Sequence, residues 1–211
     1  MEEAELIKKY NIDIEKLKEE QIKLAKQIVA KDKIDFSLSD RFGAFVNIFI
    51  KNKILSCVIV CNRLLEENNK NKFEVLDMAY FYDKARFPYL ADFRAYRELP
   101  AMIEAYNKLN EKPDVVFISG NGITHKRLGL ASHFSLLAGV PAIGIADNII
   151  DCEIKGEDIF KDNKKIGKVL ISKQGSRPMY ISPGNDISVE TSYKLCKEFI
   201  NLPHKMPEPL M

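Results

Sequence analysis

The stretch from Pro113 to Gly144 restricts the possible folds of this chain most strongly. An apolar run at residues 115–118 is followed by two closely spaced glycines, Gly120 and Gly122. Residues 132–137 favour a short helix that Gly139 can end, and residues 140–145 are apolar again. A strand, a glycine loop, a helix and a second strand in this order predict a parallel βαβ unit.

The loop after the first predicted strand is the first candidate site. Ser119, Asn121, Thr124 and His125 lie there beside the two glycines. Ligands in such sheets bind at the carboxyl ends of the strands, and glycine lets a ligand approach the backbone closely. A glycine loop after a buried strand is also often a simple turn, so this alternative stays open.

Composition predicts one globular domain. The chain has 211 residues, of which 46% are hydrophobic and 29% charged, with a net charge of +2. We expect one domain over residues 1–211, with an N-terminal extension at 1–12 and a proline-rich, non-helical tail at 201–211. The near balance of charge neither requires nor excludes nucleic acid as a partner. Oligomeric state leaves no mark on the sequence, and a monomer is the expectation.

The cysteines and the N-terminal residues favour a cytoplasmic protein. The four cysteines form no CxxC pair and no zinc-ligand spacing, so free thiols in a reducing compartment are expected. The charged start of the chain is unlike a signal peptide. No apolar run approaches the roughly 20 residues of a membrane-spanning helix.

The remaining pattern predicts a mixed sheet. Strands are expected at 45–50, 55–61 and 73–82 as an antiparallel meander, with a connector at 37–43, a tight turn at 52–53 and an exposed hairpin loop at 66–72. Helices are expected at 14–30, at 93–109 with a break at Pro100, and at 188–200 with Ser188 as the cap. Further strands are expected at 168–171 and 179–181, after a polar excursion. This order predicts an α/β, ribonuclease-H-like fold: a meander plus parallel βαβ units, with helices on both faces.

Seven short segments stand out along the chain, namely Phe87-Pro-Tyr89, Tyr96-Arg-Glu98-Leu-Pro100, Lys112-Pro-Asp-Val-Val116, Leu128-Gly-Leu-Ala-Ser-His133, Pro141-Ala-Ile-Gly144, Ile181-Ser-Pro-Gly184 and Pro207-Glu-Pro209. In this order they resemble motifs of the endonuclease V family, which nicks DNA or RNA near deaminated adenine. The resemblance covers most of the chain.

The chain departs from the family at residues that the resemblance implies are catalytic. The first-strand aspartate is absent, and Asn47 is its likeliest counterpart. Ser119 stands for the aspartate of the Asp-Gly-x-Gly loop, and Asp147 for a lysine. The wedge motif Pro-Tyr-Ile-Pro-Gly becomes Pro-Tyr-Leu-Ala-Asp at 88–92, and Asn185 replaces a histidine. Two lost carboxylates remove most of the charge that would offset the dehydration of Mg²⁺.

The resemblance then implies the site residues. Glu98, His125 and Asp147 are the catalytic candidates, and Glu98 is the one remaining candidate ligand for Mg²⁺. The residues implied to contact nucleic acid are Tyr89, Gly120, Asn121, Gly122, Lys126, Arg127, Gly144 and Gly184. Lys84, Arg86, Arg94 and Arg97 lie nearby in the sequence and could contact phosphates.

Each assignment has a structural alternative. Glu98 could instead pair with Arg94 or Arg97. His125 could be an ordinary loop histidine, Tyr89 a half-buried junction residue, and a Ser119–His125 nucleophile pair is conceivable. His133 is read as packing and capping. Asp40 and Asp114 are further carboxylates, although both resemble turn residues.

Three functional hypotheses follow. The first is an endonuclease-V-like protein that binds inosine-containing DNA or RNA with lost or weak cleavage, a pseudoenzyme. The second is an active endonuclease V that acts in DNA repair through a rearranged site of Glu98 and Asp147. The third is a role without nucleic acid, such as a small-molecule pocket at the Ser119–His125 loop or a scaffold for a partner.

Overall fold

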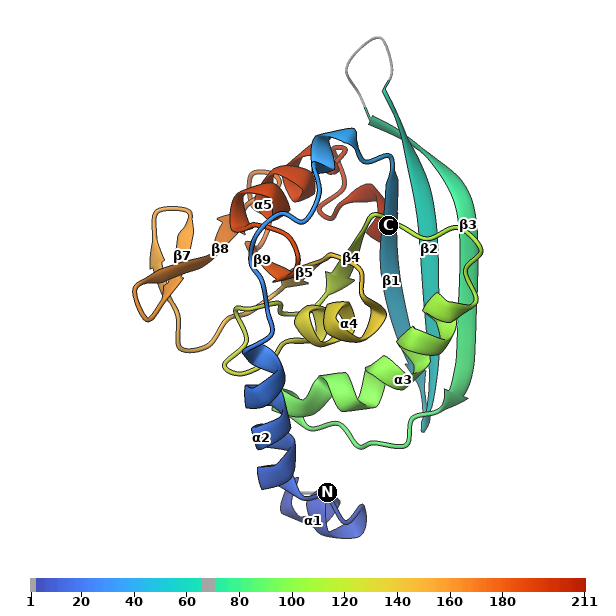
Figure 1. Cartoon of the computed structure of the whole chain (residues 1–211), viewed down its shortest axis with the longest axis vertical. Helices are drawn as coiled ribbons and strands as arrows, with labels where there is room; N and C mark the ends of the chain where they lie inside the picture. Colours follow the sequence, from blue (N-terminus) through green and yellow to red (C-terminus); the bar gives the residue numbers. More distant parts are fainter. Residues whose placement is uncertain (1–2, 66–70) are drawn as a thin grey trace.

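The computed structural model describes residues 3–65 and 71–211, which form a mixed sheet flanked by helices (Figure 1). The predicted loop at 66–72 falls mostly outside the described residues. The strand order is β3-β2-β1-β4-β5-β9-β8-β7-β6. In Figure 1 the strand labels stand in this order from right to left, beginning with β3 and ending with β7. The strands are β1 (Arg41–Ile50), β2 (Lys53–Leu65), β3 (Asn71–Lys84), β4 (Val115–Ser119), β5 (Ala142–Ala146), β6 (Glu153–Lys155), β7 (Asp158–Lys161), β8 (Lys164–Leu170) and β9 (Met179–Asn185).

The predicted meander and βαβ unit are both present. β1, β2 and β3 pair in antiparallel order, while β1, β4 and β5 are parallel neighbours. The helix α4 (Leu130–Ala138) connects β4 to β5 and ends at Gly139, whose φ of 67° is left-handed. The α/β, ribonuclease-H-like class predicted from the sequence is confirmed.

Several strands of the sheet are longer than predicted. β1 begins at Arg41 rather than 45, because its first residues pair on one side with β2 and on the other with β4. The polar excursion after β5 contains β6 and β7, whose charged side chains lie on a small antiparallel extension. β9 runs antiparallel to β5, so the parallel part of the sheet stops at β5.

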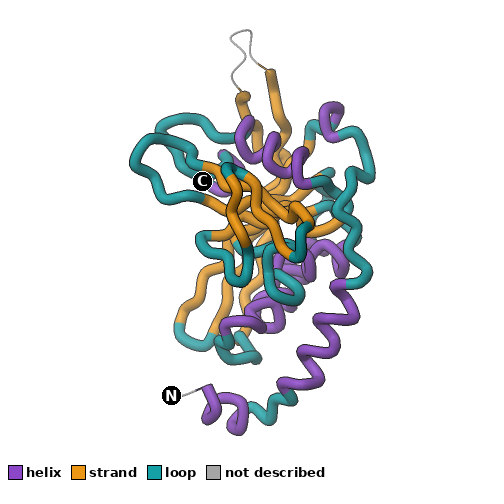
Figure 2. The backbone as a smooth tube through the Cα atoms, turned by 90° about the vertical axis from the view of Figure 1, so that its left-hand side faces the viewer, coloured by secondary structure: helices purple, strands orange, loops and turns teal. Residues whose placement is uncertain are grey.

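Helices cover both faces of the sheet, and each face has its own core. On one face, α3 (Arg94–Asn107) and α4 pack over a cluster that includes Phe45, Ile118 and Phe134. On the other face, α5 (Val189–Glu198) packs over a cluster that includes Phe42, Phe117 and Phe199. Figure 2 shows helical segments on both sides of the strands.

Two helix predictions were wrong in extent. The helix α2 (Ile14–Ala25) ends five residues before residue 30, because Val29 N–H donates to Asn185 Oδ1 and its carbonyl accepts from Asp186. The segment therefore joins the end of β9 instead of continuing as a helix. α3 passes through Pro100 without a break: Pro100 is exposed, while buried neighbours such as Leu99 and Met102 hold the helix on the sheet. One missing N–H on the outer side is tolerated there.

The two ends of the chain contain short helices that the sequence did not predict. α1 (Glu3–Lys9) lies in the N-terminal extension and buries none of its residues. The tail contains a single 3₁₀ turn, η3 (Glu208–Leu210), with a proline at its start. Other short turns are η1 (Phe36–Leu38) in the connector and η2 (Ala91–Phe93) before α3. Ser188 caps α5 as predicted, because its side chain accepts from Thr191 N–H.

The four cysteines are free thiols, as expected. Burial raises the pKa of Cys57, Cys61, Cys152 and Cys196. No helix in the described part of the chain is long and apolar enough to cross a membrane.

Candidate nucleic-acid interface

The glycine loop after β4 is fixed to β9 by hydrogen bonds. Gly122 N–H donates to Ser182 Oγ at 3.1 Å, and Ile123 N–H donates to the Pro183 carbonyl at 2.9 Å. The Thr124 hydroxyl lies 2.9 Å from Asn121 Oδ1 and 3.0 Å from Ser182 Oγ. The loop is therefore fixed against β9, and one of the bonds joins two residues, Gly122 and Ser182, that are 60 residues apart in sequence.

Close packing explains three of the predicted glycine positions. A Cβ on Gly122 would lie 2.1 Å from the Pro183 carbonyl oxygen, and one on Gly144 would lie 2.3 Å from the Gly122 nitrogen. Both distances are far below contact, so neither position accepts a side chain. Gly184 is similarly close to the backbone of Ala131. A structural role thus accounts for these glycines, and their contact with nucleic acid remains a prediction.

Glu98 is a buried carboxylate that accepts hydrogen bonds from two other side chains of the protein. Only 2% of the residue is exposed. Arg94 binds it in bidentate fashion, through Nε to Oε1 and through Nη2 to Oε2 at 3.1 Å. Asn47 Nδ2 donates to Oε2 at 2.7 Å. Of the two readings left open for Glu98, the pair with Arg94 is present, although the carboxylate is buried rather than on the helix surface.

The residues around Glu98 do not fit a divalent metal ion. Hard cations need several oxygen ligands, carboxylates above all, and both oxygens of Glu98 are already bound to an arginine or an amide. Within residues 3–65 and 71–211, no group of three or more His, Cys, Asp or Glu side chains could hold a metal. The cation beside Glu98 is a guanidinium of the protein itself.

Of the other residues predicted at the metal site, Asn47 and Ser119 lie near the Glu98–Arg94 pair, whereas Asp147 does not. Asn47, Arg94 and Ser119 line one cavity of about 220 Å³, together with Met206 and Leu210 from the tail. Asp147 is 91% exposed at the side chain and lies 3.9 Å from Lys205 Nζ. No hydrogen bond or ion pair in the described structure joins Asp147 to Glu98.

Two smaller cavities continue along the glycine loop. One of about 50 Å³ is lined by Arg94, Asp92, Asn121 and His125, among others, and one of about 30 Å³ shares Asp92, Asn121 and His125. Because these volumes are below the several hundred Å³ of typical small-molecule sites, they do not favour the small-molecule hypothesis at this loop.

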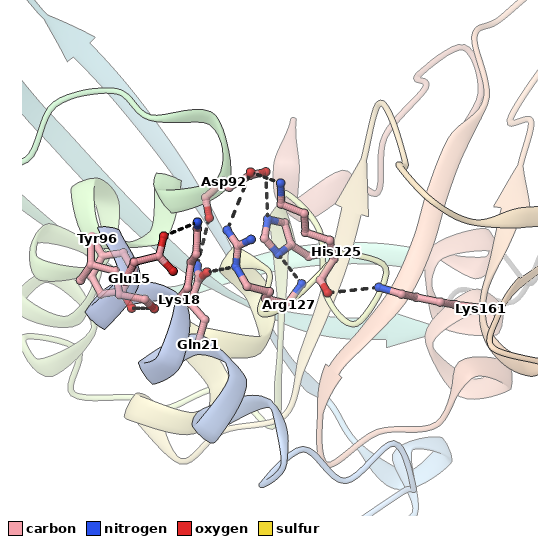
Figure 3. Close-up of polar contacts among 10 residues, drawn as sticks. Glu15, Lys18, Gln21, Asp92, Tyr96, His125, Arg127 and Lys161 are labelled. Atoms are coloured by element: carbon pink, nitrogen blue, oxygen red, sulfur yellow. Dashed lines mark hydrogen bonds and ion pairs between the residues drawn. The ribbon is translucent and has the colours of Figure 1, made fainter. Parts of the chain in front are cut away.

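The basic residues of the loop surround one carboxylate, that of Asp92 (Figure 3). Lys126 Nζ forms an ion pair with Asp92 Oδ2, and Arg127 Nη2 lies 3.8 Å from the same oxygen. Gln21 joins the cluster, because its amide donates to the Asp92 carbonyl at 3.0 Å and accepts from Arg127 Nε at 2.6 Å. Lys126 and Arg127, which are expected to contact nucleic acid, therefore share the single negative charge of Asp92.

His125 is neutral and faces the same carboxylate. Its Nδ1 accepts from Arg127 N–H at 3.1 Å, and its Nε2 lies 3.9 Å from Asp92 Oδ1. Burial lowers the pKa of His125 to about 4, although Asp92 acts in the opposite direction. No hydrogen bond in the described structure joins His125 to Ser119, so the conceived nucleophile pair has no geometric support.

The remaining predicted contacts lie on the surface before α3 or inside the core. Tyr89 is 63% exposed, which leaves its ring free to stack and disagrees with the half-buried alternative. Arg86 pairs with Asp83 at 3.5 Å, and Arg97 lies over the Phe49 ring. Asp114 pairs with Arg41 at 3.3 Å, as a structural residue would.

His133 is a packing residue, and its ring stands edge-on to Tyr96 with 5.5 Å between the ring centres. It does not cap α4, since the cap position is Gly129 and has no side-chain hydrogen bond. A cavity of about 830 Å³ between α3, the ends of β2 and β3, and α4 is lined by His133, Tyr96 and Arg97, among others. It shares no lining residue with the cavities at the loop.

Sequence reasoning missed Asp92 and Gln21 as members of the site. They come from η2 and α2, far from the loop in sequence. A weak signal was present, because an acidic residue stands at 92 where the resembled motif has glycine. Nothing in the sequence pairs that residue with Lys126 and Arg127.

Comparisons with known proteins agree on one family. The model of the family described as Endonuclease V matches residues 22–211. Endonuclease V of Thermosipho melanesiensis is 37% identical over 170 residues, which cover 76% of this chain and 71% of that protein. Endonuclease V of Bacillus thuringiensis subsp. konkukian is 32% identical over 219 residues, covering 95% and 91%.

Solved structures agree in fold. The Bacillus subtilis endonuclease V superposes with a TM-score of 0.80 at 26% identity, covering 95% of this chain and 89% of that one. The catalytic domain of human endonuclease V has a TM-score of 0.79 at 24% identity, covering 94% and 93%. Endonuclease V of Ciona intestinalis, solved with DNA containing an inosine followed by a ribo-adenosine, has a TM-score of 0.76 at 24% identity, covering 93% and 92%.

Proposed function

Because this chain belongs to the endonuclease V family, we propose that it binds nucleic acid containing inosine along its glycine-loop edge and does not cut the strand by a metal-dependent route. The single observation that carries the absence of metal-dependent cleavage is the Glu98 carboxylate, because Arg94 and Asn47 already donate hydrogen bonds to both of its oxygens. Membership of the family and the intact glycine loop support the binding of nucleic acid.

The loop edge offers what an extended polynucleotide needs. Tyr89 presents an exposed aromatic ring, on which a base can stack for about 1–3 kcal/mol. Lys126 lines one of the cavities at the loop, and Arg127 shares the Asp92 carboxylate with it. Phosphate contacts of such cations position a strand without reading its sequence.

The residues that the structure describes can position a strand, but none of them forms an activated nucleophile. Glu98 is held as an ion-paired acceptor, and Asp147 lies away from it in solvent. His125 is neutral with Nδ1 bonded to a backbone N–H, so it can donate one hydrogen bond from Nε2. Binding without hydrolysis is the function that these groups support best.

A pair of assays tests the proposal. Fluorescence anisotropy with inosine-bearing and inosine-free oligonucleotides of DNA and RNA should give salt-sensitive binding that is tighter for inosine. A nicking assay with Mg²⁺ or Mn²⁺ should give no product above that of a heat-inactivated sample. Product that disappears in Glu98→Gln would establish the alternative, an active enzyme, whereas absence of binding to every oligonucleotide would refute nucleic-acid recognition.

A further inference from the structure

The cavity between Asn47, Arg94 and Ser119 combines a positively charged group with an unpaired polar atom. Arg94 uses Nε and Nη2 to bind Glu98, and no hydrogen bond to Nη1 is present in the described structure. Nη1 lies 3.3 Å from the position that a Cβ on Gly120 would take. The free edge of the guanidinium therefore faces the glycine loop.

The pair is arranged so that the cation, and not the carboxylate, meets solvent. The Arg94 side chain is 39% exposed and that of Glu98 only 3%. Glu98 is fixed from behind by Asn47 Nδ2. A ligand that enters the cavity thus meets a guanidinium oriented by two hydrogen bonds, with its remaining donors in the fork geometry that suits phosphate oxygens.

A second, independent observation points to a ligand in the same cavity. Asn47 Oδ1 is buried and has no hydrogen-bond partner among the described residues. Its amide cannot be turned around, because only the NH₂ group can donate to Glu98. Buried acceptors are normally paired, so the cavity lacks a donor. A nucleotide offers both requirements, with phosphate oxygens as acceptors and sugar or base groups as donors.

We propose that this cavity is a metal-independent phosphodiester site, in which Arg94 supplies the positive charge that a divalent cation would otherwise provide. Glu98 is then a positioning residue, and Ser119 adds a hydroxyl at the edge of the same cavity. This inference rests on the proposed nucleic-acid binding and adds how one phosphate is held. No bond is made or broken in the site.

The first experiment measures oligonucleotide binding in EDTA and in Mg²⁺ at matched ionic strength. The wild-type protein should bind equally in both, since Arg94 is always charged. Arg94→Met should weaken binding roughly three- to tenfold and make the slope of log K against log salt shallower by about 0.7–0.9, the value of one phosphate contact. Lys197→Met, which removes an exposed cation from α5 on the opposite face, is the matched control and should change neither quantity.

The double variant Arg94→Met/Glu98→Met separates binding from structure. It removes the pair together and leaves no lone buried carboxylate, so it should fold while binding as weakly as Arg94→Met. Recovery of wild-type affinity in the double variant would mean that Arg94 only neutralises Glu98, and the inference would be wrong. Loss of wild-type binding in EDTA with return in Mg²⁺ would overturn it as well.

A Mn²⁺ titration by calorimetry makes the test independent of nucleic acid. We expect no saturable Mn²⁺ binding to the wild-type protein, and a stoichiometric site abolished by Glu98→Gln would overturn the inference directly. If no oligonucleotide binds under any condition, the proposed function fails and the phosphodiester site fails with it. The Mn²⁺ titration still tests whether Arg94 takes the place of a divalent cation beside Glu98.

Discussion

Asp92→Asn should increase the affinity of this protein for nucleic acid. In the wild type, the Asp92 carboxylate forms an ion pair with Lys126 and lies 3.8 Å from Arg127. It therefore competes with phosphates for both cations. Asparagine keeps the backbone carbonyl that accepts from Gln21, so the fold around η2 should persist while the negative charge is lost.

The size of the effect follows from charge and distance. A pair of unit charges about 4 Å apart interacts by about 1 kcal/mol in water and by more near a protein surface, and this interaction must be given up when a phosphate takes over a cation. Releasing one or two cations should steepen the slope of log K against log salt by about 0.7–1.8 and raise affinity roughly three- to tenfold at moderate salt. Loss of the surface pairs should cost about 1 kcal/mol of folding stability or less.

Anisotropy titrations over a salt series, with thermal unfolding in parallel, measure both quantities. Asp158→Asn is the matched control, because Asp158 on β7 also pairs with two lysines of β8, Lys165 at 3.8 Å and Lys168 at 3.3 Å. If Asp92→Asn binds no more tightly than Asp158→Asn while remaining folded, Lys126 and Arg127 do not contact phosphates and the reasoning is refuted.

Three further predictions concern stability. Gly144→Ala should destabilise the protein by about 3 kcal/mol or more, since its Cβ would lie 2.3 Å from the Gly122 nitrogen. Urea denaturation measures this loss, and a variant as stable as the wild type would contradict the close approach of the two backbone segments. Ser182→Ala should cost about 1–3 kcal/mol, because Gly122 N–H loses its partner in a buried place, and faster amide exchange at Gly122 is the local readout. Burial lowers the pKa of His133 to about 4, whereas its pKa in the unfolded chain is near 6.5. The unfolded chain therefore binds more protons between these values, and the contribution of His133 to the unfolding free energy should fall by up to roughly 3 kcal/mol as pH drops from about 6.5 to 4, with His125 adding a contribution of the same sign. His133→Phe should flatten that part of a urea-denaturation pH series, and an unchanged slope would argue against the buried neutral imidazole.

Local patterns in the sequence predicted most of the elements correctly. The glycine stop at Gly139 and the Ser188 cap depend on interactions within a few residues, and the βαβ unit follows from apolar runs and turn residues that are local signals, which is why all three could be predicted. Errors arose where a distant partner decided the outcome. α2 ends early because the segment after Ala25 bonds to Asn185, which lies 156 residues from Val29.

The candidate site divides in the same way. The resemblance led to Glu98 and to the loop residues, and the sequence already raised a pair between Glu98 and Arg94, four residues apart on one helix face. It could not reveal that the carboxylate is buried or that Asn47 fixes it from β1. The contacts of Asp92 with Lys126 and Arg127 join η2 to the loop across more than 30 residues, and no periodicity encodes them.

By itself, the sequence determined the fold class, the family and the absence of a full carboxylate set, because hydrophobic period, turn residues and motif order are local properties of the chain. Only the tertiary structure decided what replaced the missing charge. The glycine loop that begins at Gly120 is intact, yet the cation beside Glu98 is Arg94 and the cations beside Asp92 are already paired. Charge balance in a buried site depends on distances of a few ångströms between elements far apart in sequence, and folding alone sets those distances.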